Sequence, residues 1–203
     1  KITSEVTDRK PYESISQIAI GPKGDQAVLT SMSFEWVTRT SANPAFADTE
    51  RWEAGGFESG SISDVFYSPD GSLVGSVGSH GIVRDTESGE VLGKFDNGDL
   101  GILASGKLGA ISSDNELMVF VGEKRTGDNS KTYLLQCYRI SSGEKVWENS
   151  LQVSELQFRE GNKIISAIRG GSNPAILRID ASTGKVLESY PLAMGEFNEV
   201  NTS

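Results

Sequence analysis

The chain has 203 residues, of which 19 are Lys or Arg and 28 are Asp or Glu, so its formal net charge is −9. This charge repels a phosphate backbone, and general nucleic-acid binding is therefore excluded as the expected function. No window approaches the roughly 18 consecutive apolar residues that a membrane span needs. We expect a soluble protein without a membrane partner, with the cytoplasm slightly favoured over secretion.

Four similar segments follow one another, each centred on a turn between two alternating apolar stretches. The first is SISQIAIGPKGDQAVLTSM with its turn at Gly24, and SISDVFYSPDGSLVGSV repeats it at Gly71. GAISSDNELMVFVG turns at Asn115, and VSELQFREGNKIISAI turns at Gly161. The turns lie about 45 residues apart, a period typical of repeat architectures. The 23 glycines suit such tight turns better than long helices.

A second turn runs in phase with the first. DTESGEVLGKF, RISSGEKVWENS and RIDASTGKVLESY turn at Gly89, Gly143 and Gly184, and DTERWEAGG is a degenerate version in the first segment. Glycine supplies the positive φ that a tight hairpin needs, while Asp, Ser and Thr bond the local backbone. Each segment is therefore predicted to hold four short strands in meander order.

Units of this kind are typical of β-propeller blades. We interpret the chain as an N-terminal extension or strand of a neighbouring blade (1–13), four blades (14–54, 61–95, 107–151 and 152–192) and a C-terminal extension or start of a further blade (193–203). FYSPDGSLVGSVGSHGIVRD resembles the WD-repeat family, with Arg84 and Asp85 in place of the Trp-Asp pair. DASTGKVLESY is equally similar to blades of pyrroloquinoline-quinone-type propellers. The implied fold class is all-β, a propeller of four-stranded antiparallel blades within a larger ring.

Residues suited to catalysis or metal binding are few. His80 is the only histidine and Cys137 the only cysteine, so a zinc site with the usual nitrogen and sulfur ligands is not expected. DNGDL, at 96–100, has carboxylates but lacks the ligand count of a calcium loop. We expect no enzyme, cofactor or metal. The alternative is a quinone-dependent or other small-molecule enzyme of propeller fold.

The tryptophans Trp52 and Trp147 occupy matching places in the outer strands of the first and third blades. Large aromatic side chains at matching places are expected to pack between blades rather than to stack on a ligand. We therefore assign both to the packing of the fold.

Basic residues recur in the loops between the second and third strands of successive blades. These loops carry His80 in the second blade, Lys124 and Arg125 in the third, and Arg169 in the fourth. In WD-type propellers such loops share one rim, where ligands commonly dock. A basic rim on an acidic protein predicts recognition of a protein or acidic peptide, and scattered solubilising charge is the alternative. The predicted function is a non-catalytic protein-interaction or scaffolding module.

Four blades are the lower limit for a propeller, and the WD-like rings that these blades resemble use about seven or eight. An incomplete ring exposes apolar surface on its first and last blades. We expect a second subunit or a second copy to complete the ring, with a compact four-bladed monomer as the alternative.

Overall fold

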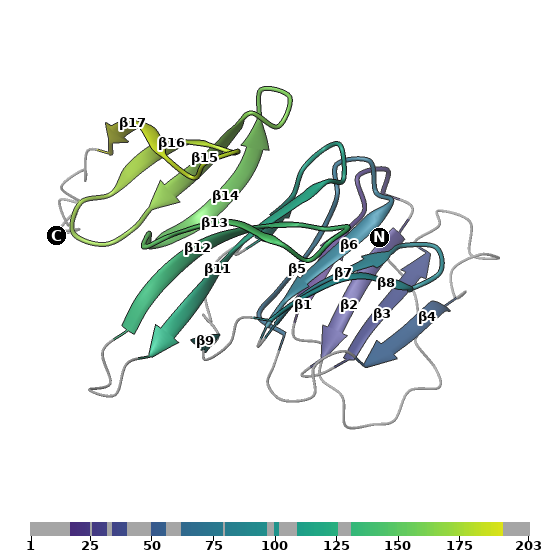
Figure 1. Ribbon diagram of the computed structural model, residues 1–203. Coiled ribbons are helices and arrows are strands. Elements are labelled where there is room, and N and C mark those ends of the chain that lie inside the picture. The colour runs from purple at the N-terminus through teal and green to yellow at the C-terminus, as the bar shows by residue number, and fades with distance from the viewer. Residues whose placement is uncertain are drawn as a thin grey trace, which may run out of the picture.

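The chain folds into four antiparallel β-sheets that stand side by side in chain order (Figure 1). The computed structural model describes residues 17–24, 26–31, 34–39, 50–55, 62–78, 80–96, 100–101, 109–125 and 131–192. These residues form strands and turns without a helix, which confirms the predicted all-β class. The predicted extensions at 1–13 and 193–203 lie outside the described residues.

We call the four sheets blades 1 to 4. Blade 1 consists of β1 (Gln17–Ile20), β2 (Gln26–Ser31), β3 (Phe34–Arg39) and β4 (Glu50–Gly55). Blade 2 consists of β5 (Asp64–Tyr67), β6 (Leu73–Val77), β7 (His80–Asp85) and β8 (Val91–Asp96). Blade 3 consists of β10 (Gly109–Ile111), β11 (Leu117–Arg125), β12 (Lys131–Arg139) and β13 (Lys145–Asn149). Blade 4 consists of β14 (Val153–Arg159), β15 (Ile164–Arg169), β16 (Ala175–Asp180) and β17 (Val186–Pro191).

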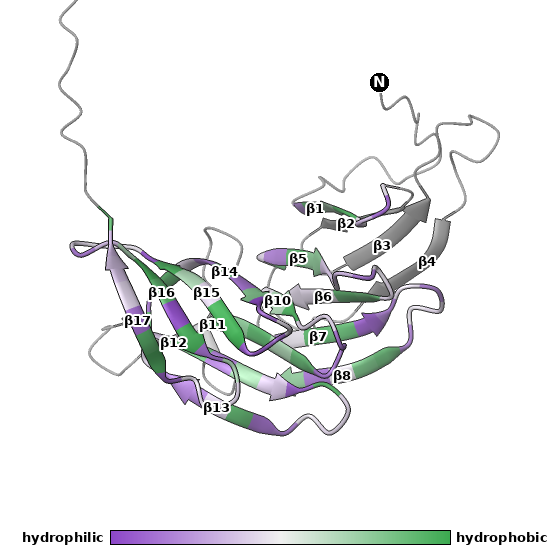
Figure 2. Cartoon of the chain, turned by 90° about the horizontal axis from the view of Figure 1, so that it is seen from above, coloured by the Kyte–Doolittle hydropathy of each residue, from purple (hydrophilic) through white to green (hydrophobic). Residues whose placement is uncertain are grey.

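The strand order of every blade is the predicted meander, because each strand pairs with the next one along the chain. Blade 3 has one addition that the sequence did not indicate. The short strand β9 (Leu100–Gly101) pairs with β11 at Glu123 and Lys124, beyond the part of β11 that pairs with β10. Viewed from above, the blades form an open arc with β1, β5, β10 and β14 on its concave side (Figure 2).

The predicted turns are confirmed by their backbone angles. A positive φ occurs at the first turn of every blade and at the second turns of blades 2 to 4, namely at Gly24, Gly71, Asn115, Gly161, Gly89, Gly143 and Gly184. The second turn of blade 1 lies outside the described residues. This left-handed region is costly for residues with a β-carbon, so glycine or asparagine is expected there. The local sequence therefore determines where each hairpin reverses.

The hydrophobic core lies between the blades rather than within them. Between blades 2 and 3, Phe95 and Phe120 both contact the ring of Tyr138, with centroids 5.1 and 5.4 Å apart. Between blades 3 and 4, the buried side chains of β11 and β12 pack against those of β15 and β16. Blades 2 and 3 are therefore each stabilised by burying one apolar face against the next blade.

The contact between blades 3 and 4 includes one of the two predicted packing tryptophans. Trp147 is buried, and its Nε1 donates a hydrogen bond to the carbonyl oxygen of Ala181 at 2.8 Å. Its ring covers Gly184, in the turn between β16 and β17. The packing role is thus confirmed for Trp147, whereas the side chain of Trp52 lies outside the described residues.

Candidate functional site

The candidate binding residues lie at matching hairpins of three blades. His80 is the first residue of β7, Lys124 and Arg125 end β11, and Arg169 ends β15. Because all blades share one meander order, the hairpins β6–β7, β11–β12 and β15–β16 lie on the same side of the stack. We call these three hairpin ends the hairpin rim.

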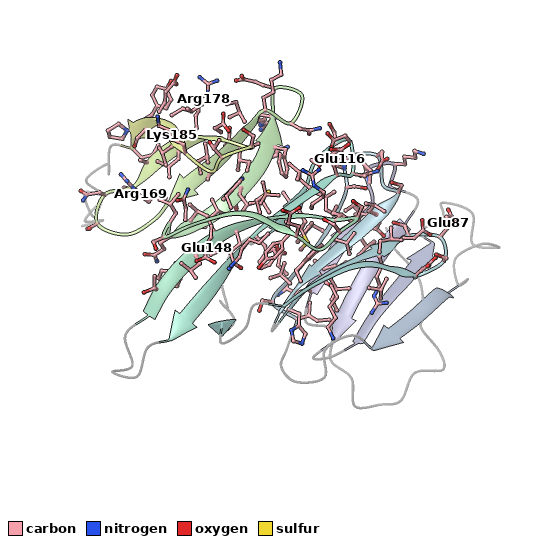
Figure 3. The ribbon with its side chains drawn as sticks, in the orientation of Figure 1. Glu87, Glu116, Glu148, Arg169, Arg178 and Lys185 are labelled. Atoms are coloured by element: carbon pink, nitrogen blue, oxygen red, sulfur yellow. The ribbon has the colours of Figure 1, made fainter. Side chains whose placement is uncertain are left out.

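Within the hairpin rim, His80, the pair Lys124 and Arg125, and Arg169 lie in three different hairpins. Arg169 is half-buried, and its Nε donates to the carbonyl oxygen of Asn173 at 3.0 Å, which closes the β15–β16 loop (Figure 3). His80 is half-buried at a position that pairs with Asp96. The side chains of Lys124 and Arg125 lie outside the described residues. The structure therefore gives the four residues a common rim, and it gives Arg169 a local structural role as well.

The β11–β12 hairpin is the longest part of this rim. Its strands have 9 residues each, compared with 5 in β6 and 6 in β15. At its end Arg125 pairs with Lys131 and Lys124 pairs with Thr132. Lys131 was not predicted from the sequence, although it is the last residue of the insertion EKRTGDNSK, which also contains Lys124 and Arg125. Three basic residues therefore belong to the last two residue pairs of this hairpin.

We call the opposite side the turn rim. It holds the β1–β2, β5–β6, β10–β11 and β14–β15 turns, and the turns between the third and fourth strands of blades 2 to 4. In the β5–β6 turn, Asp70 Oδ1 accepts bonds from Ser68 Oγ at 2.7 Å and from Ser72 N at 3.0 Å. Partial burial raises the pKa of Asp70, but the bonds from Ser68, Ser72 and Asn115 outweigh it and lower the pKa to about 2. The carboxylate is therefore charged at neutral pH, and the hydrogen bonds that it accepts stabilise the turn.

Turns of neighbouring blades are joined along this rim. Asn115, in blade 3, donates from Nδ2 to Asp70 Oδ2 of blade 2 at 2.9 Å. Ser113 of the same turn donates from its backbone N to Asn162 Oδ1 of blade 4 at 2.8 Å. The turn rim thus links blades 2, 3 and 4 by polar contacts between residues far apart in the sequence.

A cleft of about 200 Å³ lies on the turn rim between blades 1 and 2, lined by 21–23, 70–72 and 85–87. Its carboxylates already have partners, because Asp85 Oδ1 accepts the backbone N of Glu87 and of Ser88 at 3.0 and 2.8 Å. The Ser88 backbone bond is the main cause that lowers the pKa of Asp85. These acids therefore stabilise their own turns.

Comparison with known proteins decides the fold. No family model and no curated protein matches the sequence. The C-terminal WD40 domain of Sif2 matches 87% of this chain with a TM-score of 0.61 at 15% identity. The β-propeller domain of Myceliophteria thermophila Cps50 (Swd1) matches 93% with a TM-score of 0.63 at 12% identity, and Chaetomium thermophilum Sqt1 matches 89% with a TM-score of 0.66 at 17% identity. The chain has a β-propeller fold, similar to that of these structures.

The chain spans about half the length of these solved structures, namely 46% of Sif2, 58% of Cps50 and 48% of Sqt1. The recognised resemblance to WD-repeat propellers is thereby confirmed at the level of the fold. Four blades of the propeller are present in the described residues.

The propeller core holds the single cysteine in an unreactive state. Cys137 is fully buried in β12, and burial raises the pKa of its thiol to about 12, against a small opposing effect of Arg139. A thiol that stays protonated is a poor nucleophile and a poor metal ligand. In the described part of the propeller, no group of three or more His, Cys, Asp or Glu residues is placed to hold a metal ion. None of the described residues forms a helix able to cross a membrane.

Proposed function

We propose that this propeller segment is a protein-interaction module whose hairpin rim binds an acidic peptide segment of a partner. The observation that carries the proposal is the matching position of His80, Lys124, Arg125 and Arg169 on one rim of three successive blades. Rigid blades with variable hairpins present such side chains at fixed spacing. The likeness to WD40 domains is consistent with a scaffold role.

Charge supports the choice of an acidic partner. The chain has a net charge of −9, whereas the end of the β11–β12 hairpin contains the basic residues Lys124, Arg125 and Lys131. Lys and Arg bind carboxylates through charge-assisted hydrogen bonds, and complementary potential accelerates encounter with the partner. Binding of this kind weakens as salt screens exposed charges.

The test measures binding of a fluorescently labelled peptide of consecutive glutamates by anisotropy at low and at high salt. The test variant changes Lys124, Arg125 and Arg169 together to Glu. The control changes Lys23, Lys163 and Lys185 to Glu, because these three exposed residues lie in turns of the opposite rim. Both triple variants change the net charge equally.

We expect the hairpin-rim variant to lose binding by at least tenfold and the turn-rim variant to retain it, with both variants folded as judged by circular dichroism. Equal losses in the two variants would show that binding follows net charge rather than the hairpin rim. Absence of salt-sensitive binding by the unmodified chain would also refute the proposal. Stabilisation of the chain by a redox quinone in a thermal-shift assay would favour the enzymatic alternative instead.

A further inference from the structure

The β11–β12 hairpin of blade 3 projects past the outer strand of its own sheet. Towards the hairpin, β13 pairs with β12 no further than Leu135, so residues 131–134 have no strand partner on that side among the described residues. The chain bends away from the line of β13 directly after Asn149, where the N–H of Leu151 donates to the carbonyl oxygen of Asn149 at 3.0 Å. We call residues 131–134 of β12 the open edge.

The other blades are closed at this end. In blades 1, 2 and 4 the third strand is paired with the outer strand from its first residue onward. These first pairs are Phe34 with Gly55, His80 with Asp96, and Ala175 with Pro191. Among the described parts of the four blades, the open edge is therefore specific to blade 3.

The inner edge of the same hairpin already carries an added strand. β10 pairs with β11 as far as Phe120, and beyond it β9 pairs with Glu123 and Lys124. β9 lies in the chain between blades 2 and 3, so its pairing adds a short extended segment to the projecting part of the hairpin. The hairpin therefore accepts strand addition on its inner side, and the open edge offers the corresponding position on its outer side.

Backbone groups of Tyr133 and Lys131 are directed towards the open edge. Consecutive residues of an antiparallel strand direct their N–H and C=O groups to opposite neighbours. The N–H of Arg139, at the end of β12, is directed towards the β13 side, because it donates to the carbonyl oxygen of Glu144 at 2.9 Å. The pairing of β12 with β11 has no bulge, so every second residue counted back from Arg139 has the same orientation. This series includes Tyr133 and Lys131.

Charge at the open edge selects the kind of strand that can bind there. The last three residue pairs of the hairpin contain the basic residues Lys124, Arg125 and Lys131 and one acidic residue, Glu123. Lysine on an edge strand opposes pairing between two copies of the same protein, since like charges would be brought together. An acidic strand meets the opposite charge instead. The open edge is therefore suited to an acidic partner rather than to a second copy.

We propose that the open edge binds an extended acidic segment of a partner protein, which pairs antiparallel with β12 and continues blade 3 beyond β13. The antiparallel direction is that of β13, and antiparallel pairing is slightly more stable than parallel pairing. Backbone hydrogen bonds supply affinity, and the basic residues select carboxylates. This inference rests on the proposed function, because it specifies how the hairpin rim binds an acidic peptide.

The experiment compares three fluorescently labelled peptides of consecutive glutamates by anisotropy with the unmodified chain. The first has ordinary amides, the second is N-methylated at every second residue, and the third is N-methylated at every residue. All three have the same charge. Alternate methylation leaves one edge of the peptide able to donate hydrogen bonds, whereas complete methylation removes the donors of both edges. We expect the first two peptides to bind alike and the third to bind more weakly by about tenfold or more.

Two variants of Lys131 separate the backbone donor from the charge. Lys131→Ala and Lys131→Pro remove the same charge, and only proline also removes the N–H that is directed to the open edge. Proline is tolerated on an edge strand where its nitrogen is not needed for pairing with the inner neighbour. We expect Lys131→Pro to bind the ordinary peptide about fivefold more weakly than Lys131→Ala, with both variants folded by circular dichroism.

Amide hydrogen exchange, followed by NMR, locates the bound peptide on the unmodified chain. Saturation with the ordinary peptide should slow exchange at Tyr133, whose N–H is directed to the open edge, by about tenfold. Leu134 is the internal control, because its N–H is directed to β11 and should exchange at an unchanged rate.

Each outcome separates strand addition from the proposed function. Equal binding of all three peptides, together with loss of binding in the hairpin-rim triple variant, would refute strand addition and leave a purely electrostatic site. Absence of binding by the ordinary peptide would refute both. Slowed exchange at Tyr133 that develops without peptide as the protein concentration rises would show pairing between two copies and would overturn the choice of an acidic partner.

Discussion

Replacing Gly184 with Ala tests how closely blade 3 packs on the last turn of blade 4. A β-carbon at Gly184 would lie 2.5 Å from Cε3 and 2.6 Å from Cδ2 of Trp147. Moving the indole away would break its 2.8 Å bond to Ala181. Gly143 provides the matched control, because its φ of 70° is close to the 72° of Gly184 and a β-carbon there would have no atom within 4 Å.

The two variants separate backbone strain from crowding. At Gly143, alanine incurs only the left-handed backbone conformation, which costs about 1 kcal/mol. At Gly184 the same strain applies, and crowding against the indole adds about 1–3 kcal/mol. We therefore expect Gly184→Ala to lower the free energy of unfolding by about 2–4 kcal/mol and Gly143→Ala by about 1 kcal/mol.

Unfolding in guanidinium chloride, followed by tryptophan fluorescence at one fixed protein concentration, measures both values. The fixed concentration matters because association would add to the apparent stability. Equal losses for the two variants would refute the reasoning, since they would show that the indole is not pressed against Gly184. A larger loss at Gly143 would contradict it in the same way.

Three further results are expected. Ser112→Ala removes the buried hydroxyl that accepts a hydrogen bond from the Leu117 N–H at 2.9 Å, and it should lower the free energy of unfolding by about 1–3 kcal/mol in the same denaturation assay. A loss of less than about 0.5 kcal/mol would contradict a role of this bond in stability. The pKa of Asp70 is lowered from 3.8 to about 2. The charged carboxylate therefore stabilises the folded state fully at pH values above the ordinary pKa of 3.8, and this stabilisation is lost as the pH falls from 3.8 towards 2. Asp70→Asn should therefore flatten the fall in melting temperature below pH 4, and an unchanged profile would count against the turn contacts. The thiol of Cys137, whose pKa burial raises to about 12, should react with a thiol reagent only after unfolding, and rapid reaction of the native chain would disprove its burial.

Much of the fold is predictable from the sequence because turn chemistry is local. Gly71 and Asn115 adopt positive φ as their turn motifs indicate, and the spacing of the turns gives the number of blades in the described residues. The packing role of Trp147 follows from its matching place in an outer strand. These features depend on a few neighbouring residues and on a period, and a single sequence contains both.

Contacts between blades are harder to predict. The bond from Asn115 to Asp70 joins residues 45 positions apart, and its formation depends on the offset between two sheets, which no local pattern encodes. The short strand β9 is another case, since two residues carry no periodic signal. One polar substitution in blade 4 is visible in the repeats, because aligning HGIVRD, LLQCYR and AILRID places Arg178 at the position of Val83 and Cys137. To interpret this substitution, one must know which face of the strand lies towards the next blade.

The hairpin rim could be predicted from the sequence only in part. The matching hairpin positions of His80, Lys124 and Arg169 follow from the repeat, whereas the bond between Arg169 and Asn173 depends on the conformation of one loop. Lys131 was missed because the pairing of Arg125 with Lys131 becomes visible only once the strand register is known.

The contact of Trp147 with blade 4 has a consequence for the order in which the chain folds during synthesis. Strands within a blade are consecutive, so a blade can pair its strands soon after it leaves the ribosome. The acceptor of the indole bond, Ala181, is made 34 residues after Trp147, so this contact of the outer strand of blade 3 forms only after the turn between β16 and β17 has been made. Until the following blade is made, the newest of these blades therefore leaves exposed the apolar face that the following blade later buries.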